Sequence, residues 1–222
     1  MGKAEISKTY QEELDAKINR IIDITERIEP NKLTILTGSN GSGKSLVRKQ
    51  LCFKLADKID GANYKRLVVD VSMQRRTESN VYLGAMANVM HDDPWKPTSI
   101  STYHFIQTLF NSFLKDDGDK RYIVIDEPEI GMSKESQLGF VKYFESKLPE
   151  ILEKTHGIML ITHSECLVSA LKDKAVFLNM DTDISADEWI NREIIPTDLE
   201  NLGEKSHELF LAIEDRMKEN RK

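Results

Sequence analysis

Residues 38–45 read Gly-Ser-Asn-Gly-Ser-Gly-Lys-Ser, and they follow the apolar run Leu33-Thr34-Ile35-Leu36. Residues 46–51, which come next, are compatible with a helix. This is the G-x-x-x-x-G-K-S pattern of a phosphate-binding loop between a strand and a helix. Its glycines allow backbone N–H groups to turn inward around phosphates, and the helix N-terminus favours an anion. A glycine-rich turn without a ligand is the alternative, but the flanking strand and helix favour nucleotide binding in an α/β fold.

The pattern gives each residue of the loop an expected role. The Lys44 ammonium can reach the β- and γ-phosphates, and the Ser45 hydroxyl can ligate Mg²⁺. The predicted nucleotide contacts in this part of the chain are Gly38, Ser39, Asn40, Gly41, Ser42, Gly43, Lys44, Ser45 and Leu46.

A second apolar run, Tyr122-Ile123-Val124-Ile125, is followed by Asp126-Glu127-Pro128-Glu129. The run predicts a buried strand, and ligands of parallel α/β sheets bind at the carboxyl ends of the strands. Asp126 can hold Mg²⁺ there through its water shell. Glu127 can orient and deprotonate the water that attacks a γ-phosphate. An isolated Asp-Glu pair is more often an acidic turn, and the phosphate-loop sequence favours the catalytic interpretation.

A third apolar run, 157–161, ends in Thr162-His163-Ser164. A histidine at this edge can donate a hydrogen bond to the γ-phosphate or to the attacking water. Single histidines are more often incidental, but His163 follows the next strand after the Asp-Glu pair. We therefore predict Lys44, Glu127 and His163 as the catalytic residues.

Together, Gly38–Ser45, Asp126-Glu127-Pro128 and Ile161-Thr162-His163 resemble the ATP-binding-cassette (ABC) class of ATPases. Within that class they look more like the soluble AAA-type branch related to RecF and the SMC proteins than like transporter subunits. The resemblance covers most of the chain from residue 32 to residue 180. It implies a three-layer P-loop NTPase fold with a mostly parallel sheet, a Walker A loop, a Walker B aspartate and a switch histidine. It also implies ATP and Mg²⁺ as ligands, and a head-to-tail pair of chains that ATP closes.

Two further family elements match less closely. Gln74 follows the predicted strand 67–71 and is assigned as the Q-loop glutamine that touches Mg²⁺ and senses the γ-phosphate, although a solvated loop glutamine is equally compatible. Ser101 stands where the family's signature segment opens a helix and binds the partner's nucleotide. Thr102 and Tyr103 replace the two signature glycines. Side chains there would crowd a phosphate, so composite-site hydrolysis is either lost or uses donors such as Ser99 or Ser101.

Composition is that of a soluble protein with one core. The chain has 222 residues, 40% of them hydrophobic, and we expect a single domain over 1–222. A net charge of −6 argues against coating nucleic acid by charge alone, although Lys65-Arg66 and Arg75-Arg76 leave a local basic patch open. No apolar run approaches the ~20 residues of a membrane helix. Cys52 and Cys166 lack metal-ligand spacing and are expected to be buried free thiols, which favours the cytoplasm.

The remaining segments complete the predicted organisation. Apolar residues at helical spacing predict an N-terminal helix over 7–28, within a unit 1–30. Ser133 is expected to cap a helix over 133–154, and it stands where the family has its D-loop aspartate. The acidic stretch 181–185 resembles part of a calcium loop but lacks the glycine and the later glutamate, so no metal is assigned to it. The other expected elements are a short helical insert within 75–115 (a helix over 80–90), a strand over 175–179 and a terminal helix over 204–221 in the unit 200–222.

The predicted function is Mg-dependent ATP binding and hydrolysis by an ATP-gated homodimer or head-to-tail pair. Since the chain shows no second active site, we expect a separate effector protein, in nucleic-acid processing or defence. A transporter ATP-binding subunit is the first alternative, disfavoured by the helical N-terminus and the missing adenine-stacking aromatic. A nucleotide-gated binding module with weak hydrolysis is the second, favoured by the altered signature. A phosphoryl-transfer kinase is the third, disfavoured by the Asp-Glu-Pro and histidine set. The sequence assigns no residue to the base.

Overall fold

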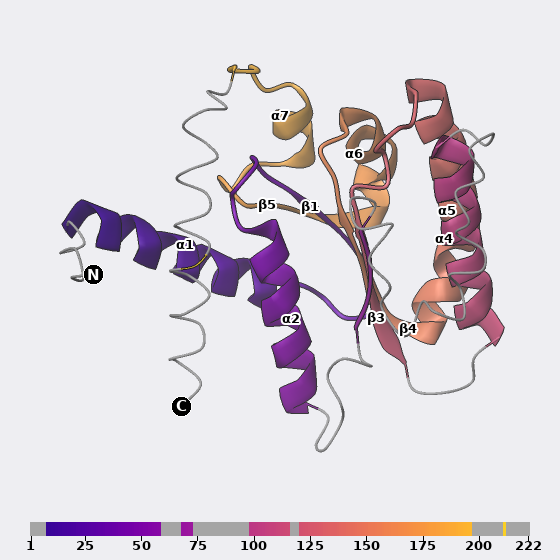
Figure 1. The fold of residues 1–222 in the computed structure, drawn as a ribbon, viewed down its shortest axis with the longest axis horizontal. Helices are drawn as coiled ribbons and strands as arrows, with labels where there is room; N and C mark the ends of the chain where they lie inside the picture. The colour runs from indigo at the N-terminus through magenta and orange to yellow at the C-terminus, as the bar shows by residue number, and fades with distance from the viewer. Residues whose placement is uncertain (1–7, 59–67, 73–97, 116–119, 197–210, 212–222) are drawn as a thin grey trace.

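A sheet of five parallel strands forms the centre of the molecule (Figure 1). The structure is a computed structural model, and it describes residues 8–58, 68–72, 98–115, 120–196 and 211. The strands lie in the order β2-β3-β4-β1-β5. Their bounds are β1 (Leu33–Thr37), β2 (Val68–Ser72), β3 (Arg121–Asp126), β4 (Thr155–Ile161) and β5 (Ala175–Asn179).

Helices cover both faces of this sheet (Figure 1). One face carries α1 (Lys8–Glu26) and α2 (Lys44–Lys58). The other face carries α4 (Thr98–Lys115), α5 (Lys134–Lys154), α6 (Glu165–Leu171) and α7 (Ala186–Ile190), and the short helix η3 (Lys172–Lys174) connects α6 to β5. The predicted α/β fold, with a parallel sheet between flanking helices, is therefore confirmed.

Alternation along the strands produces two separate cores. In β3, Ile123 and Ile125 pack with the residues of α4 and α5, whereas Tyr122 and Val124 pack with those of α1 and α2. All four are at most 1% exposed. Successive side chains of a strand point to opposite faces, so a strand with helices on both sides is apolar throughout. This is why the central strands read as continuous apolar runs in the sequence.

The strand order explains how distant motifs meet. Because crossovers between parallel strands are right-handed, α2, which leads from β1 away to β2, covers the face opposite to α4, α5 and α6. All strands point the same way, so the segments that follow β1, β3, β4 and β5 emerge at one edge. β4 lies between β1 and β3. The residues that follow β4 are therefore placed between the phosphate-loop sequence and the Asp-Glu pair.

Most elements expected from the sequence lie within a few residues of their observed bounds. Leu14, Ile18 and Ile21 of α1 are buried as the helical period predicts, and so is Ile28, which lies two residues after the helix ends. Ile22 is 38% exposed because it lies at the edge of the apolar stripe. The expected helix over 80–90 lies outside the described residues, as does most of the terminal helix over 204–221. The described residues include no candidate for a membrane-spanning helix.

Candidate functional site

The phosphate-loop sequence connects β1 to α2, as predicted. The N–H groups of Leu46 and Val47 donate to the carbonyl of Gly43, at 2.9 and 3.1 Å, so the helix begins within the motif. At Gly38 the backbone φ is +150°, and a Cβ there would lie 2.7 Å from the Cβ of Met180 and 2.8 Å from Ser42 Oγ. Only glycine fits this position without moving its neighbours. The start of the loop is thus packed tightly against Met180 and Ser42.

Lys44 folds back on the loop that carries it. Its Nζ donates to the carbonyls of Gly38, at 3.0 Å, and Ser39, at 2.9 Å. Burial lowers the pKa of Lys44, and the surrounding carboxylates oppose that shift. Those carboxylates are, in decreasing order of effect, Glu127, Asp181, Asp126 and Glu129. The ammonium can therefore bind an anion by exchanging neutral carbonyl contacts for charged ones.

The acidic pair lies at the carboxyl end of β3. Asp126 is its last residue, in register with Ile161 of β4. Glu127 has a backbone φ of 51°, in the left-handed region that side chains other than glycine's rarely occupy. Its N–H donates to the Ile161 carbonyl at 2.9 Å, which fixes this conformation. Backbone strain of about 1–3 kcal/mol at a non-glycine residue is typical of functional sites.

His163 lies beside this pair, directly after β4. Its Nε2 is 3.4 Å from Glu127 Oε1. That is longer than the ~2.7–3.2 Å of a good N–H···O bond, so the two side chains are adjacent without a short hydrogen bond. The imidazole Nε2 is buried and has no hydrogen-bond partner among the described residues. The structure thus brings together His163, Glu127 and the loop that holds Lys44.

Glu129 is a residue of this edge to which the sequence gave no role. Its Oε1 accepts a hydrogen bond from the His163 N–H at 2.8 Å, while its Oε2 is buried without a partner within the described part of the chain. It belongs to the run that follows β3, so its place after a buried strand was the available signal. Since it binds the backbone of His163, Glu129 links the segments after β3 and β4.

The segment after β4 is also fastened to α5. Ser164 caps α6 by accepting a hydrogen bond from the Leu167 N–H at 3.2 Å. Its hydroxyl donates to Gln137 Oε1 at 2.6 Å, and the Gln137 amide donates to the Met132 carbonyl at 3.2 Å. These contacts fix the backbone next to His163 between α5 and α6.

The segment after β5 also lies next to the phosphate loop, on the other side of β1, although the sequence gave it no role in the site. Both oxygens of Asp181, just after β5, accept hydrogen bonds from Ser39: the N–H at 2.7 Å and the hydroxyl at 2.9 Å. The sequence placed Asp181 in a discounted acidic loop. Its position after a predicted parallel strand was the signal that could have marked it.

The weaker family elements have mixed outcomes. Gln74 lies outside the described residues. The helix expected over 105–114 begins earlier, at Thr98, so Ser101 lies in the first turn of α4. Thr102 is buried, and the ring of Tyr103 packs edge-on against Tyr143 at 5.0 Å. Ser133 caps α5 by accepting from the Ser136 N–H at 3.3 Å. Binding of a partner's nucleotide by Ser101 stays a prediction.

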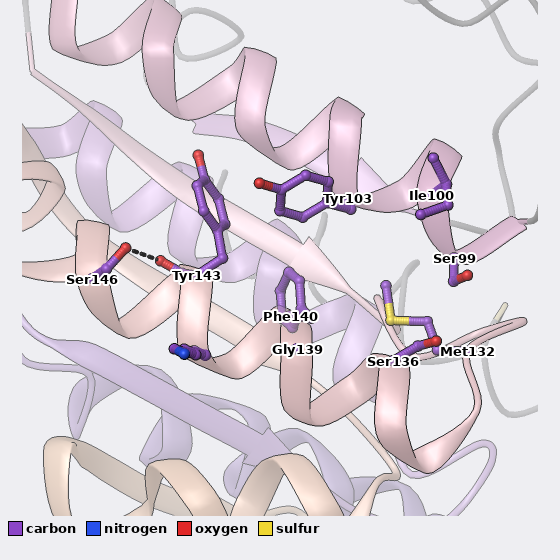
Figure 2. Close-up of a pocket in the computed structure, with 10 residues that line it drawn as sticks. Ser99, Ile100, Tyr103, Met132, Ser136, Gly139, Phe140, Tyr143 and Ser146 are labelled. Carbon is purple, nitrogen blue, oxygen red and sulfur yellow. Dashed lines mark hydrogen bonds between the residues drawn. The ribbon is translucent and has the colours of Figure 1, made fainter.

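Figure 2 shows the groove in which this packing occurs, between α4 and α5. Its volume is about 540 Å³, and Ser99, Ile100 and Tyr103 of α4 face Phe140 and Tyr143 of α5 across it. Its lining residues come from α4, α5 and the segment just before α5. The groove is thus separate from the phosphate loop.

Neither a metal-binding cluster nor a fully buried cysteine is found among the side chains that the structure describes. The described residues include no group of three His, Cys, Asp or Glu side chains arranged to hold a metal ion. Cys166 is a free thiol that is half-buried, whereas full burial was expected.

Comparisons with known proteins give distant fold similarities. No protein-family model and no curated protein matches the chain. It is similar to a structure of C. elegans PCH-2, with 17% identity and a TM-score of 0.34, over 78% of this chain and 44% of that one. It is also similar to the Aeropyrum pernix ORC2 protein in ADPNP–ADP complexes, with 13% identity and a TM-score of 0.33, over 79% and 48%.

This chain therefore spans less than half the length of either solved chain. Similarities at this level assign neither the ABC class nor an activity.

Proposed function

We propose that the chain is a magnesium-dependent ATPase of ABC type, with its active site at the edge where β1, β3 and β4 end. One observation carries the proposal. The strand order sets β4 between β1 and β3, and Glu127 Oε1 lies 3.4 Å from His163 Nε2 beside the loop of Lys44. Phosphoryl transfer asks a protein chiefly for positioning and for stabilisation of charge, and these residues can supply both.

The residues of this edge fit a magnesium–nucleotide complex. The glycine at position 38 leaves no room for a Cβ, and the Lys44 ammonium rests on exchangeable carbonyls. Ser45 and Asp126 would hold the cation, with Gln74 as the expected further ligand. Mg²⁺ usually keeps several waters and takes oxygens from the substrate, so few protein ligands suffice. When bound, the ion would neutralise charge on the phosphate oxygens.

We propose one role for each side chain, from its position and from the family resemblance. Lys44 would bind the phosphates and stabilise their negative charge. Glu127 would orient the attacking water and accept its proton. His163 would donate a hydrogen bond to the γ-phosphate or to the water, from a backbone that Glu129 holds.

The paired state and the effector belong to the same proposal. By resemblance, ATP would close a head-to-tail pair of chains that drives a separate effector protein, in nucleic-acid processing or defence. Light scattering on Glu127→Gln with and without Mg-ATP tests the pair, because the variant should hold ATP without turning it over. A mass that doubles with ATP supports pairing, and an ATP-bound monomer contradicts it.

A nucleotide-gated binding module with weak hydrolysis is the second candidate. One observation favours it: Thr102 is buried and Tyr103 packs on Tyr143, so the signature-like segment is engaged in helix packing. This candidate predicts tight ATP binding and a low phosphate release that hardly changes in Glu127→Gln. The ATPase proposal predicts a large loss.

Equilibrium binding of ATP provides the first test of the proposed function. We expect Lys44→Ala to abolish measurable binding, because it removes the ammonium group that would bind the phosphates. Lys174→Ala is the matched control: Lys174 lies in η3 before β5, at the opposite edge of the sheet, where it forms an exposed ion pair with Glu145. Equal ATP affinity in the wild type and Lys44→Ala would contradict the site assignment.

A further inference from the structure

Residues 179–183, which comprise the last residue of β5 and the segment after it, contact the phosphate loop although the two are far apart in the sequence. Ser39 donates its backbone N–H to Asp181 Oδ2 at 2.7 Å and its hydroxyl to Oδ1 at 2.9 Å. Both carboxylate oxygens thus engage one residue of the loop. Hydrogen bonds to a charged acceptor are stronger than neutral ones, so this pair restrains the backbone of Ser39.

Asn179 fixes the conformation from which Asp181 reaches the loop. Asn179 is 4% exposed, and its Nδ2 donates to Thr37 Oγ1 at 2.9 Å. Its Oδ1 accepts from the N–H groups of Asp181, at 2.9 Å, and Thr182, at 3.0 Å. The Met180 N–H donates to the Thr37 carbonyl at 2.9 Å, which continues the pairing of β5 with β1 beyond the strand.

Arg20 ties the same segment to α1. Its guanidinium donates to the carbonyls of Asn179, at 2.5 Å, and Met180, at 3.3 Å, and to Asp183 Oδ1 at 3.0 Å. Arg27 also donates to Asp183 Oδ1, at 2.6 Å. The hydrogen bonds from Arg20 and then Arg27 lower the pKa of Asp183 to about 2, so its carboxylate stays charged in mildly acidic solution as well as at neutral pH.

We propose that Asp181 is a positioning residue for the phosphate loop, and that Arg20 holds the segment that carries it. This inference rests on the proposed function, and it adds the element that preorganises the loop. Without the two bonds to Ser39, fewer molecules would have the loop in its binding-competent conformation. The apparent affinity for the nucleotide would fall in proportion to the fraction of molecules in that conformation, whereas a bound nucleotide would react at the same rate.

The charge and the geometry of Asp181 have opposite effects on ATP. A carboxylate close to the loop repels phosphates, while its hydrogen bonds hold the loop ready for them. Asp181→Asn removes the charge but keeps an acceptor for the Ser39 N–H and a donor for its hydroxyl. Asp181→Ala removes both the charge and the hydrogen bonds. The proposal therefore predicts weaker ATP binding for Asp181→Ala and wild-type or tighter binding for Asp181→Asn.

Steady-state kinetics separates positioning from a general loss of structure. We expect Asp181→Ala to raise the KM for ATP about tenfold at an unchanged kcat, from the loss of two hydrogen bonds. Arg20→Ala should raise KM in the same direction. Asp173→Ala, an exposed aspartate of η3, is the matched control and should leave both parameters unchanged. A wild-type KM in Asp181→Ala, or no rescue by Asp181→Asn, would overturn the proposal.

Amide hydrogen exchange tests the contact without nucleotide, so it separates this inference from the proposed function. We expect the Ser39 amide to exchange at least tenfold faster in Asp181→Ala than in the wild type or Asp181→Asn. Unchanged exchange at Ser39 would overturn the inference even if the chain hydrolyses ATP. If Ser39 exchanges faster in Asp181→Ala but the wild type binds no ATP, the contact between the segments is supported. The role of Asp181 in ATP binding and the proposed function are then both refuted.

Discussion

Gly38→Ala is the substitution for which the structure gives the clearest magnitude. The added Cβ would lie 2.7 Å from the Cβ of Met180 and 2.8 Å from Ser42 Oγ. Met180 cannot easily move, because its N–H is bonded to the Thr37 carbonyl. Overpacking of this kind costs about 1–3 kcal/mol. In a domain of this size each kcal/mol lowers the melting temperature by about 2–4 °C, so we expect a decrease of about 2–12 °C.

The assay is thermal unfolding followed by circular dichroism, with Gly139→Ala as the matched control. Gly139 lies in α5, and a Cβ there would meet no atom within 4 Å. Alanine is favoured over glycine in a helix by about 1 kcal/mol, so the control should raise the melting temperature by about 2–4 °C. The two substitutions should therefore have opposite signs. Wild-type stability in Gly38→Ala would refute the packing of Met180 and Ser42 around the loop.

Three further predictions concern ionisation and packing. Burial lowers the pKa of Lys44 below 10.5, so the folded protein releases this proton at a lower pH than the unfolded chain does. The melting temperature of the wild type should therefore rise relative to that of Lys44→Met as the pH rises towards 10.5, and a relative decrease would contradict this. The pKa of Asp183 is about 2 in the folded state rather than 3.8, so its stabilising contribution should be complete above pH 3.8 and should vanish as the pH falls to about 2. The melting temperatures of Asp183→Asn and the wild type should therefore converge near pH 2, and a difference that stays constant with pH would refute this. Phe144 is 0% exposed, so Phe144→Ala should lower the free energy of unfolding by about 3–5 kcal/mol in denaturant titrations. Leu138 is 51% exposed, and Leu138→Ala should change this free energy by less than about 0.5 kcal/mol. Similar losses in the two variants would contradict the assigned core.

The elements that carry local signals were predictable. The phosphate-loop pattern located β1 and the start of α2, because its glycines and lysine stand at fixed spacing. The apolar run 122–125 predicted β3, since a strand covered on both faces is apolar throughout. Ser133 at the start of α5 was recognisable as a cap from its residue type and the residues that follow it.

Contacts that depend on the order of strands were not predictable. Nothing local in the sequence states that β4 lies between β1 and β3, or that β5 borders β1. The contact between Ser39 and Asp181 joins residues that are 142 positions apart, and it exists only because β1 and β5 are neighbours. Glu129 was missed for a related reason: its partner is a backbone N–H, at His163, which no sequence pattern marks.

Phosphate release by Glu127→Gln, measured together with bound ATP, tests the central claim most directly. The claim is that the Glu127 carboxylate activates water at a site where Lys44 holds the nucleotide. We predict that the variant retains ATP and releases phosphate about 10²–10⁴-fold more slowly than the wild type, as expected for loss of a general base. A variant that binds ATP and hydrolyses it at the wild-type rate would contradict the assigned chemistry.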